Sequence, residues 1–450
     1  MKQTERFLGL IAAALLTTSA WAQTMTFTYA DGATATASEM ADGSTLVQLP
    51  AGTDLNAAIT GVKVNGTEVT ASTVTPDPTK TFITEGEIET FVYDGKAYSF
   101  RFLAGEYFTA VFFSDPHVEQ TNYGGLTVDN EKTFVSNICN MGKNGGKVVT
   151  FSKAPKGYVP TADIVFCLGD MDKDSESNGT NFTTAMQGFN DAGIPFITMA
   201  GNHDLVPDYW TGDNPDYGLT SGTGGSSCNN TALSIISSQW AKAAELGGFN
   251  VTTINDGTNH TQANPFVFEY KGVQFYCGQT YWFQKPYSGS YTVVMGSVIS
   301  SATYYAADGV INALETYVNA NKEKPSVWMQ HYPFAFGSDC DRWWLDQNDK
   351  GLFIAPTNAS SSPYYTSDLI YTSNNPDAAA KKNKLAEIIK MTKSNTETGE
   401  HLHFSGHVHS NGTNTYNGVT DKTIGMPGKA YVVLCKEGVG VLEIIETNFY

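Results

Sequence analysis

The chain has 450 residues, of which 41% are hydrophobic and 12% aromatic, and 43 are glycines. This length exceeds the usual size of one hydrophobic core, so two domains are expected, and the composition excludes a disordered or fibrous protein. The formal charge of -18, with no basic patch to offset it, argues against a stable nucleic-acid partner.

Residues 1–22 have the features of a secretory signal peptide. Lys2 and Arg6 precede an apolar run from Phe7 to Leu16, and small residues at the end of the segment provide a cleavage site. We therefore expect cleavage after Ala22 and a secreted or periplasmic mature protein. No later stretch approaches the roughly 20 apolar residues of a membrane-spanning helix, so no transmembrane segment is expected.

Residues 23–106 predict a small all-β domain. Alternating segments such as Met25–Tyr29 and Glu89–Tyr93 are separated by turn pairs that include Asn65-Gly66 and Asp94-Gly95. Short strands at this spacing are typical of an Ig-like β-sandwich. Because this segment contains no histidine, we assign no chemistry to it.

Residues 107–450 alternate apolar strands with helical patterns, as in a layered α/β domain. Buried strands are expected at Phe108–Phe113, Ala162–Leu168, Ile194–Met199, Ser326–Gln330 and Leu402–Phe404. Helices are expected at Asp129–Met141, Asn181–Ala192, Ala306–Ala320 and Asp377–Met391. Hairpins are expected at Phe266–Tyr270 with Val273–Cys277 and at Tyr431–Cys435 with Val439–Ile445. Two stretches without periodicity, 205–264 and 334–376, are expected to be loop insertions.

The six cysteines lack the spacing of a zinc site. Those expected to be buried free thiols lie in apolar segments and are Cys139, Cys167, Cys277 and Cys435. Cys228 and Cys340 lie in polar loops, where export would permit a disulfide between them.

Polar residues of the same kinds follow each of the five predicted buried strands. They are Asp115-Pro116-His117, Gly169-Asp170, Gly201-Asn202-His203-Asp204, His331 and Gly406-His407-Val408-His409. The carboxyl ends of strands in an α/β sheet meet in one crevice, so we expect these side chains to converge. Carboxylate, amide and imidazole ligands together suit Mn, Fe or Zn better than Mg or Ca.

The spacing within these motifs also suits metal binding. In extended backbone, residues two apart point to the same side, so Asp115 and His117 could reach one metal, and Pro116 favours an extended Asp115. Asp170 offers two carboxylate oxygens that could bridge two cations. The glycines expected to permit sharp departures from the strands are Gly169, Gly201 and Gly406.

This ordered series resembles the calcineurin-like metallophosphoesterases, whose motifs are DxH, GD, GNH[D/E], H and GHxH. The resemblance covers roughly residues 108–450 and implies a four-layer α/β/β/α domain that hydrolyses a phosphate monoester or diester. It implies one metal ion held by Asp115, His117, Asp170 and His409, and a second held by Asp170, Asn202, His331 and His407. It further implies a metal-bridging hydroxide as nucleophile. His203, supported by Asp204, would contact the phosphate or protonate the leaving group.

The expected substrate is a small phosphorylated molecule such as a nucleotide, a phosphodiester or a sugar phosphate. In protein phosphatases of this superfamily the second motif continues as GDxxDRG, whereas here Met171-Asp172-Lys173-Asp174 follows Asp170, which makes activity on phosphoproteins less expected. Several aromatic residues could form a substrate wall or pack the segments that carry them. They are Tyr209, Trp210, Tyr281, Trp282, Tyr332, Trp343 and Trp344.

Two other functions compete with this prediction. One is a catalytically silent exported binding or adhesion protein on the same scaffold, and the other is a two-metal hydrolase that acts on a different centre such as an amide. Three histidines lie outside the motifs. We interpret His401 and His403 as structural residues and His260 as a solvated loop residue.

Overall fold

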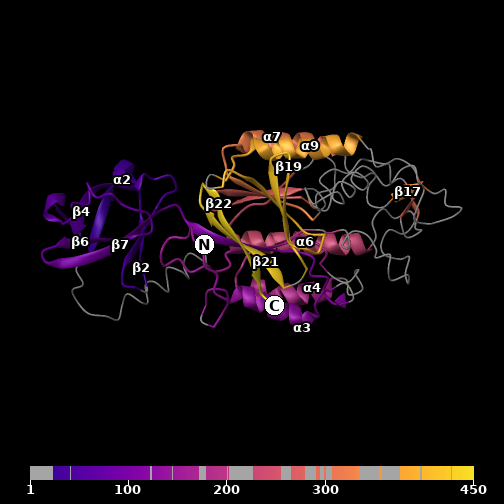
Figure 1. Ribbon diagram of the computed structural model, residues 1–450, viewed down its shortest axis with the longest axis horizontal. Coiled ribbons are helices and arrows are strands. Elements are labelled where there is room, and N and C mark those ends of the chain that lie inside the picture. Colours follow the sequence, from indigo (N-terminus) through magenta and orange to yellow (C-terminus); the bar gives the residue numbers. More distant parts are fainter. Residues whose placement is uncertain are drawn as a thin grey trace. The chain divides into compact units, whose positions relative to one another are not determined.

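The chain forms two compact units in a computed structural model (Figure 1), Met1–Glu106 with Pro155–Gly157 and Tyr107–Ala154 with Tyr158–Tyr450. The structure describes residues 24–40, 42–121, 124–143, 145–171, 179–199, 201, 227–254, 265–278, 290–293, 298–300, 307–331, 333, 354–356, 376–395, 398–426 and 428–450. The predicted signal peptide, residues 1–22, lies outside these ranges. No helix within them combines the length and hydrophobicity of a membrane span.

The first unit contains two small sheets, ordered β1-β4-β5 and β2-β3-β7-β6. Its elements are β1 (Met25–Tyr29), β2 (Thr36–Glu39), β3 (Thr45–Leu49), α2 (Leu55–Ala58), β4 (Ile59–Val64), β5 (Thr67–Val69), β6 (Ile88–Tyr93) and β7 (Lys96–Ala104). Strands β3 and β7 are parallel, and the other pairs are antiparallel. The predicted turn residues Asn65 and Asp94 adopt positive φ before glycine, as tight hairpins require. One hydrophobic cluster joins both sheets, with the Phe27 ring centroid 4.8 Å from that of Phe100.

The second unit is a mixed α/β structure with two large sheets, which confirms the predicted α/β class. The five-stranded sheet runs β10 (Phe196–Thr198), β9 (Ile164–Cys167), β8 (Tyr107–Phe113), β21 (Lys429–Lys436) and β22 (Gly440–Asn448). The seven-stranded sheet runs β11 (Thr252–Thr253), β12 (Phe266–Tyr270), β13 (Val273–Cys277), β16 (Ser326–Met329), β18 (His401–Ser405), β20 (Val419–Thr423) and β19 (Gly412–Tyr416). Strands β8, β9 and β10 are parallel in the first sheet, and β13, β16, β18 and β20 in the second.

The two large sheets pack face to face through aromatic side chains. Phe112 of β8 stacks on Phe404 of β18 in the opposite sheet, with ring centroids 4.2 Å apart and an interplanar angle of 6°. Phe166 of β9 stacks in the same way on Phe275 of β13, at 5.2 Å. All four rings are fully buried in one cluster. Apolar residues on the facing sides of both sheets therefore bring together the ends of strands far apart in the sequence.

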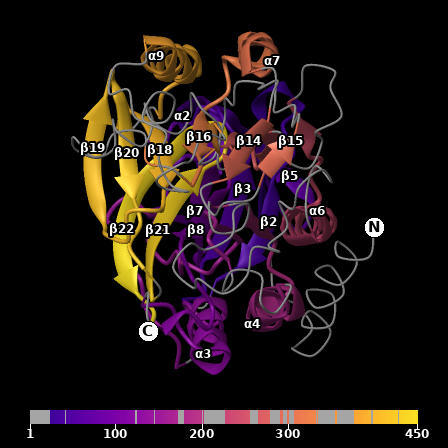
Figure 2. The same ribbon diagram turned by 90° about the vertical axis from the view of Figure 1, so that its right-hand side faces the viewer.

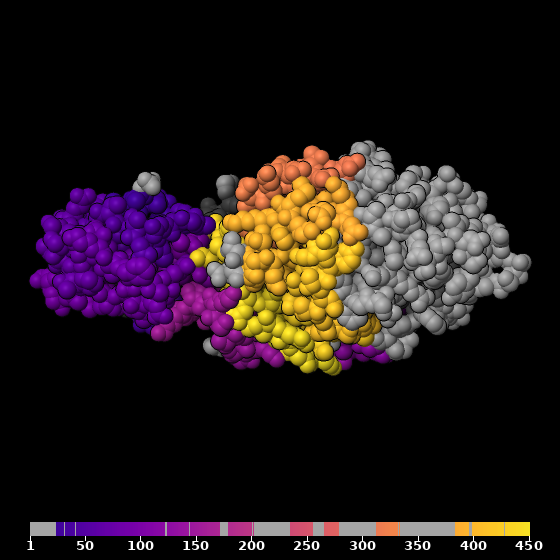
Figure 3. All heavy atoms as spheres, turned by 45° about the horizontal axis from the view of Figure 1, so that its top comes forward, coloured from indigo at the N-terminus to yellow at the C-terminus, as the bar shows by residue number. Residues whose placement is uncertain are grey.

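Helices cover the outer faces of the two sheets (Figures 1 and 2). They are α3 (Val128–Cys139), α4 (Thr180–Asp191), α7 (Ala307–Asn321) and α9 (Pro376–Met391). A fifth helix, α6 (Ser227–Gly247), lies beside the edge strand β10, where Trp240 Nε1 donates a hydrogen bond to the Thr198 carbonyl oxygen at 3.1 Å. Helices α3 and α4 lie on the five-stranded sheet, and α7 and α9 on the seven-stranded sheet, where Leu314 and Leu385 share a cluster with Trp328. The surface of α7 and of the chain after residue 383 is visible in orange to yellow in Figure 3.

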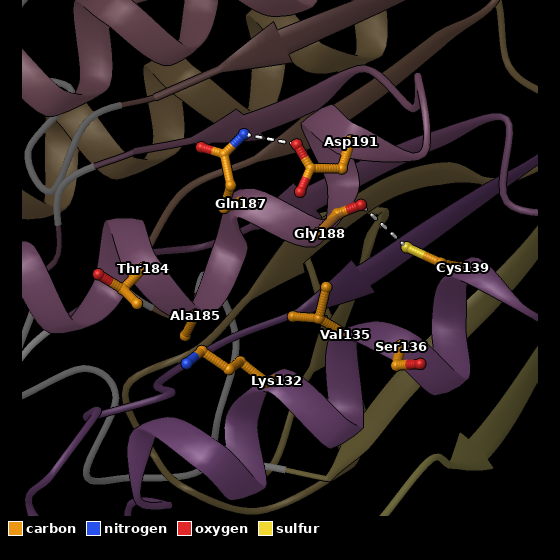
Figure 4. Close-up of a pocket in the computed structure, with 9 residues that line it drawn as sticks. All are labelled: Lys132, Val135, Ser136, Cys139, Thr184, Ala185, Gln187, Gly188 and Asp191. Atoms are coloured by element: carbon orange, nitrogen blue, oxygen red, sulfur yellow. Dashed lines mark hydrogen bonds between the residues drawn. The ribbon is translucent and has the colours of Figure 1, made fainter.

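Helices α3 and α4 approach closely at Gly188. A Cβ at this position would lie 2.9 Å from Val135 Cγ1, so a larger residue would push the helices apart. The Cys139 thiol donates a hydrogen bond to the Gly188 carbonyl oxygen over 3.6 Å. These residues line a surface groove of about 360 Å³ between the helices (Figure 4).

The predicted strands and helices are confirmed to within a few residues at their ends, but the insertions were misread. Residues 205–264 were expected to be a loop, whereas α6 occupies Ser227–Gly247. Its buried residues Ile236, Trp240 and Ala243 have helical spacing, and the surrounding Gly, Ser and Asn residues masked that signal. Short strands of the second unit that were not predicted are β11, β14 (Ser290–Val293), β15 (Val298–Ser300), β17 (Ile354–Pro356) and the hairpin β19–β20.

Four cysteines are free and buried, as predicted from their apolar surroundings. They are Cys139, Cys167, Cys277 and Cys435. Cys228 was expected in a polar loop, but its backbone lies in the first turn of α6. Its side chain and Cys340 lie outside the described residues, so their proposed disulfide stays a prediction.

Glu131 is an unusual buried acid in the first turn of α3. It has no exposed surface, and neither carboxyl oxygen has a hydrogen-bond partner. Burial raises the pKa of this carboxyl from 4.5 to about 8, because the anion loses its hydration. The side chain therefore holds a proton at neutral pH in the folded protein.

We predict that Glu131 makes the stability of the second unit fall as the pH rises. Between pH 4.5 and about 8 the folded state holds a proton that the unfolded state has lost, so the free energy of unfolding decreases with pH. The free energy of unfolding of the wild type minus that of Glu131→Gln should therefore fall by up to about 5 kcal/mol across that range. Urea unfolding followed by tryptophan fluorescence measures it, because every tryptophan after residue 22 lies in the second unit.

Asp129→Asn is the matched control, since Asp129 lies in the same helical turn with its side chain 94% exposed. Its free energy of unfolding should follow the wild-type pH profile. Parallel profiles for wild type and Glu131→Gln would show that the Glu131 carboxyl is not protonated in the folded state.

Candidate metal centre

Six of the predicted ligands follow four neighbouring strand ends. Asp115 and His117 follow β8, Asp170 follows β9, His331 follows β16, and His407 and His409 follow β18. Strands β8 and β9 belong to one large sheet, and β16 and β18 belong to the other. The face-to-face packing of the sheets therefore brings the two sets of ligands to one place.

Hydrogen bonds join the loops within each sheet beyond the last strand residues. In the five-stranded sheet, the Asp115 amide donates to the Gly169 carbonyl (3.1 Å) and the His117 amide donates to the Asp170 carbonyl (3.0 Å). In the seven-stranded sheet, the Gly406 amide donates to the His331 carbonyl (2.9 Å). The ligand loops thus remain attached to their neighbours past the end of each sheet.

Further hydrogen bonds connect the sheets at the site itself. The backbone amide of His407 donates to both carboxylate oxygens of Asp115, at 3.1 and 2.9 Å. His331 Nδ1 lies 2.8 Å from the Leu168 carbonyl oxygen. That oxygen can only accept, so Nδ1 carries a proton, and Nε2 is the nitrogen that is bare when the ring is neutral. The contact fixes which nitrogen of His331 faces Asp170.

The first ligand group consists of Asp115, His117, Asp170 and His409, whose ligand atoms all lie within 4.8 Å of one another. His117 Nε2 lies 3.2 Å from His409 Nε2 and 3.6 Å from Asp170 Oδ2. His409 Nε2 lies 3.2 Å from Asp115 Oδ1. Three of these side chains are buried, whereas that of His409 is 29% exposed. The group therefore reaches solvent on the His409 side.

The second ligand group consists of Asp170, His331 and His407. His331 Nε2 lies 3.1 Å from Asp170 Oδ2, and the His331 and His407 ring centroids are 5.2 Å apart. Asp170 belongs to both groups, so one buried carboxylate connects them. Among the described residues, no third cluster of His, Cys, Asp and Glu ligand atoms is this close.

The protonation of these groups reflects two buried carboxylates among imidazoles. Burial lowers the pKa of His331, but the Asp170 and Asp115 carboxylates outweigh it and raise the pKa to about 9. Burial also lowers the pKa of His409, and the hydrogen bond to Asp115 raises it above its usual value. For Asp115, burial raises the pKa, while His409 and His331 bring it below its usual value overall. Protons on histidine thus compensate the buried carboxylates.

The donor atoms of both groups fit divalent metal ions. Each group combines carboxylate oxygen with imidazole nitrogen, which are the ligands preferred by Zn, Mn and Fe. A bound cation would compensate the buried carboxylates in place of the histidine protons, so binding would release protons. The described residues could therefore hold two ions, one on each side of Asp170.

The backbone at the ligands differs from the prediction. Asp115 and His117 were expected to be extended, but their φ angles are 52° and 41°. Other ligands with positive φ are Asp170, His407 and His409, at 53°, 67° and 55°. The left-handed region is sparsely populated by residues other than glycine, although Asp and His enter it more readily than most. The ligands turn inward through tight bends that the hydrogen bonds between loops hold in place.

The glycines beside the ligands serve two different purposes. Gly169 has a φ of 103°, which confirms that it permits a sharp departure from β9. At Gly201, a Cβ would overlap Asp170, and at Gly406 it would overlap Ser114 Oγ and Asp115 Oδ2. Close packing against the ligand loops, rather than a sharp bend, therefore requires glycine at these two positions.

Several predicted residues lie outside the described part of the chain. They are the candidate ligand Asn202, the candidate catalytic residues His203 and Asp204, and the solvated His260. The candidate aromatic wall of Tyr209, Trp210, Tyr281, Trp282, Tyr332, Trp343 and Trp344 is also outside it. Gly201, immediately before Asn202, is described and lies against Asp170.

His401 and His403 belong to neither ligand group. His403 is buried, and its Nδ1 lies 2.9 Å from Asp421 Oδ1 on the neighbouring strand β20. Ser405 also donates a hydrogen bond to Asp421 Oδ1, at 2.9 Å. These contacts agree with the structural role predicted for His403.

Gln120, whose side chain contacts His117, was not predicted from the sequence. Gln120 Oε1 lies 2.6 Å from His117 Nδ1, and both side chains are buried. A polar residue three positions after a candidate ligand is the one sequence signal for this contact, and it is weak because many turns contain one.

The chain matches no protein-family model and no curated protein. A purple acid phosphatase from yellow lupin (Lupinus luteus) is 12% identical with a TM-score of 0.36, over 82% of this chain and 61% of the lupin protein. A dimetal phosphatase from Danio rerio is 11% identical with a TM-score of 0.29, over 76% of this chain and 99% of the Danio rerio protein. The phosphopantetheinyl hydrolase of Mycobacterium tuberculosis is 12% identical with a TM-score of 0.31, over 72% of this chain and 92% of the mycobacterial protein. These similarities assign neither a family nor an activity to this chain.

We predict that Gly406→Ala disrupts the metal centre. The added Cβ would collide with Ser114 and Asp115 and displace the loop that carries His407 and His409. Overpacking of this kind costs about 1–3 kcal/mol, and it should lower metal content measured by plasma mass spectrometry after dialysis. Gly61→Ala is the control, because its Cβ would lie 3.3 Å from Thr28 Cβ in the first unit. Equal metal content in the two variants would contradict this role of Gly406.

Proposed function

We propose that this chain is an exported metallophosphoesterase that hydrolyses a phosphate monoester or diester with two metal ions. The observation that supports this proposal is the pair of Asp/His groups that share Asp170 at the ends of strands from two sheets. One group reaches solvent at His409, so a substrate could approach it from that side. Two ions around one carboxylate form the kind of site that stabilises an in-line displacement at phosphorus.

In this proposal, Asp115, His117, Asp170 and His409 hold one ion. Asp170, His331 and His407 hold the second together with Asn202. When bound, the ions would supply Lewis-acid activation of water and positive charge for the phosphoryl group. His203 would donate a proton to the leaving group, and Asp204 would support His203.

Charge gives a physical reason for placing metal ions at this site. The chain has a formal charge of -18, which repels an anionic substrate at long range. Two divalent ions would outweigh the carboxylates of Asp115 and Asp170 and leave the site locally positive. The attraction of a phosphorylated substrate would then depend on the metals, and chelation should abolish binding as well as turnover.

We predict that metal-dependent hydrolysis is lost when a shared ligand is removed. Purified protein loaded with Mn²⁺ or Zn²⁺ should release nitrophenol from nitrophenyl phosphate or from its diester, and a chelator should stop the reaction. Asp170→Ala and His331→Ala should lose at least about 100-fold in kcat/KM, because the metals supply several kcal/mol of transition-state stabilisation. His203→Ala should keep its metals and lose about 10²–10⁴-fold, as expected for a general acid.

His401→Ala is the matched control for His331→Ala, because His401 lies on the adjacent strand β18 and belongs to neither ligand group. It should keep wild-type activity. Unchanged rates of hydrolysis in Asp170→Ala and His331→Ala would contradict the proposed mechanism. Two bound metals without hydrolysis of any phosphate ester would instead favour a binding protein or an enzyme acting on another centre.

The proposal extends to the fold and to the location of the protein. We propose that the helix-covered pair of sheets is the four-layer α/β/β/α arrangement of calcineurin-like metallophosphoesterases and that residues 23–106 form an Ig-like sandwich. Secretion or export to the periplasm is supported by the charged and apolar pattern of residues 1–22. N-terminal sequencing of the mature protein should begin at Gln23, and an intact Met1 would contradict export by this route.

A further inference from the structure

The ring of the predicted ligand His117 contacts the side chain of Gln120. Its Nδ1 lies 2.6 Å from Gln120 Oε1. His117 has no exposed surface and Gln120 is 1% exposed, so water does not compete for this contact. A buried hydrogen bond of this length holds the orientation of the imidazole about its ring axis.

A tight turn places Gln120 beside the ring. The Gln120 amide donates to the His117 carbonyl (2.8 Å), and the Gly125 amide donates to the Gln120 carbonyl (3.0 Å). A Cβ at Gly125 would overlap the His117 carbonyl, so the returning chain packs directly on the ligand's backbone. The Thr127 hydroxyl then caps α3 by accepting a hydrogen bond from the Asn130 amide. Gln120 is therefore positioned by the backbone and by the helix that follows.

The geometry also shows which nitrogen of His117 would bind a metal ion. Nε2 lies 3.2 Å from His409 Nε2 and 3.6 Å from Asp170 Oδ2, so it faces the first ligand group. A nitrogen that binds a metal carries no proton, so the proton of a neutral His117 must be on Nδ1. The amide oxygen of Gln120 is the acceptor that this tautomer requires.

We propose that Gln120 is a positioning residue that holds His117 in its metal-binding tautomer and orientation. This inference rests on the metal centre of the proposed function. Histidine ligands commonly donate their second N–H to a carboxylate or carbonyl group, and loss of that partner typically costs 10–100-fold in metal affinity. An amide oxygen serves here without adding negative charge to a site that already buries Asp115 and Asp170.

The two ligand groups differ in how their histidines are held. His331, in the second group, is fixed by the backbone carbonyl of Leu168 at 2.8 Å, which no side-chain substitution at Gln120 alters. Gln120 contacts His117, which belongs to the first group and is not a member of the second. Removing the Gln120 amide should therefore weaken one of two metal-binding events and leave the other.

The test is a Co²⁺ titration of the metal-free protein, followed by visible absorption and by competition with a chelator. In Gln120→Leu, one binding event should weaken about 10–100-fold with an altered absorption spectrum, while the other keeps its wild-type affinity. Gln120→Glu retains an acceptor oxygen and should restore both events. Gln120→Met, which is close in shape and lacks the amide, should repeat the effect if the leucine variant folds poorly.

Gln274→Leu is the matched control, because Gln274 is also a buried glutamine, lies on β13 and contacts Glu269 rather than a ligand. It should bind both ions as the wild type does. Unchanged Co²⁺ binding in Gln120→Leu and Gln120→Met, or equal weakening of both events, would overturn the inference. If the wild type binds two ions and the variants behave as expected without any phosphoesterase activity, the proposed function fails and the inference on Gln120 stands.

Discussion

The candidate site depends on the face-to-face packing of two sheets. Stacked rings such as Phe112 and Phe404 join the sheets at their centre, and the ligand loops lie just beyond the ends of the strands that carry these rings. Each sheet alone supplies an incomplete set of ligands. Packing of the apolar faces therefore assembles the polar residues, and a shift of one sheet against the other would separate Asp115 from His407.

The same packing creates an electrostatic cost that the site must offset. Asp115 and Asp170 are buried, and five of the ligands adopt backbone angles that side chains seldom favour. In the absence of a cation, raised histidine pKa values allow protons to compensate these carboxylates. Because metal ions would displace these protons, affinity at the site should rise with pH until the histidines are neutral.

Much of this arrangement could be predicted from the sequence because its signals are local. Apolar runs marked the strands, and each run ended in residues suited to metal ligation, such as Asp115 and His331. The backbone at Asp115 could not be predicted this way, because its positive φ results from hydrogen bonds to loops distant in the sequence. Gln120 was missed for a related reason, since its importance depends on where the His117 ring points.

Helix α6 shows a different limit of the sequence signal. Its apolar positions have helical spacing, but glycine, serine and asparagine around them gave the whole stretch the composition of a loop. Burial against β10 and the sheet core stabilises the helix despite this composition. Composition is thus a weaker guide than periodicity where an amphipathic helix is embedded in polar sequence.

The proposed function requires that two metal ions bind, one on either side of Asp170. Anomalous diffraction from crystals of the full chain grown with Mn²⁺, recorded above and below the metal absorption edge, tests it most directly. Two peaks are expected, one beside Asp115, His117 and His409 and one beside His331 and His407, with Asp170 between them. A map with no peak at these residues, or with metal bound only elsewhere, would contradict it.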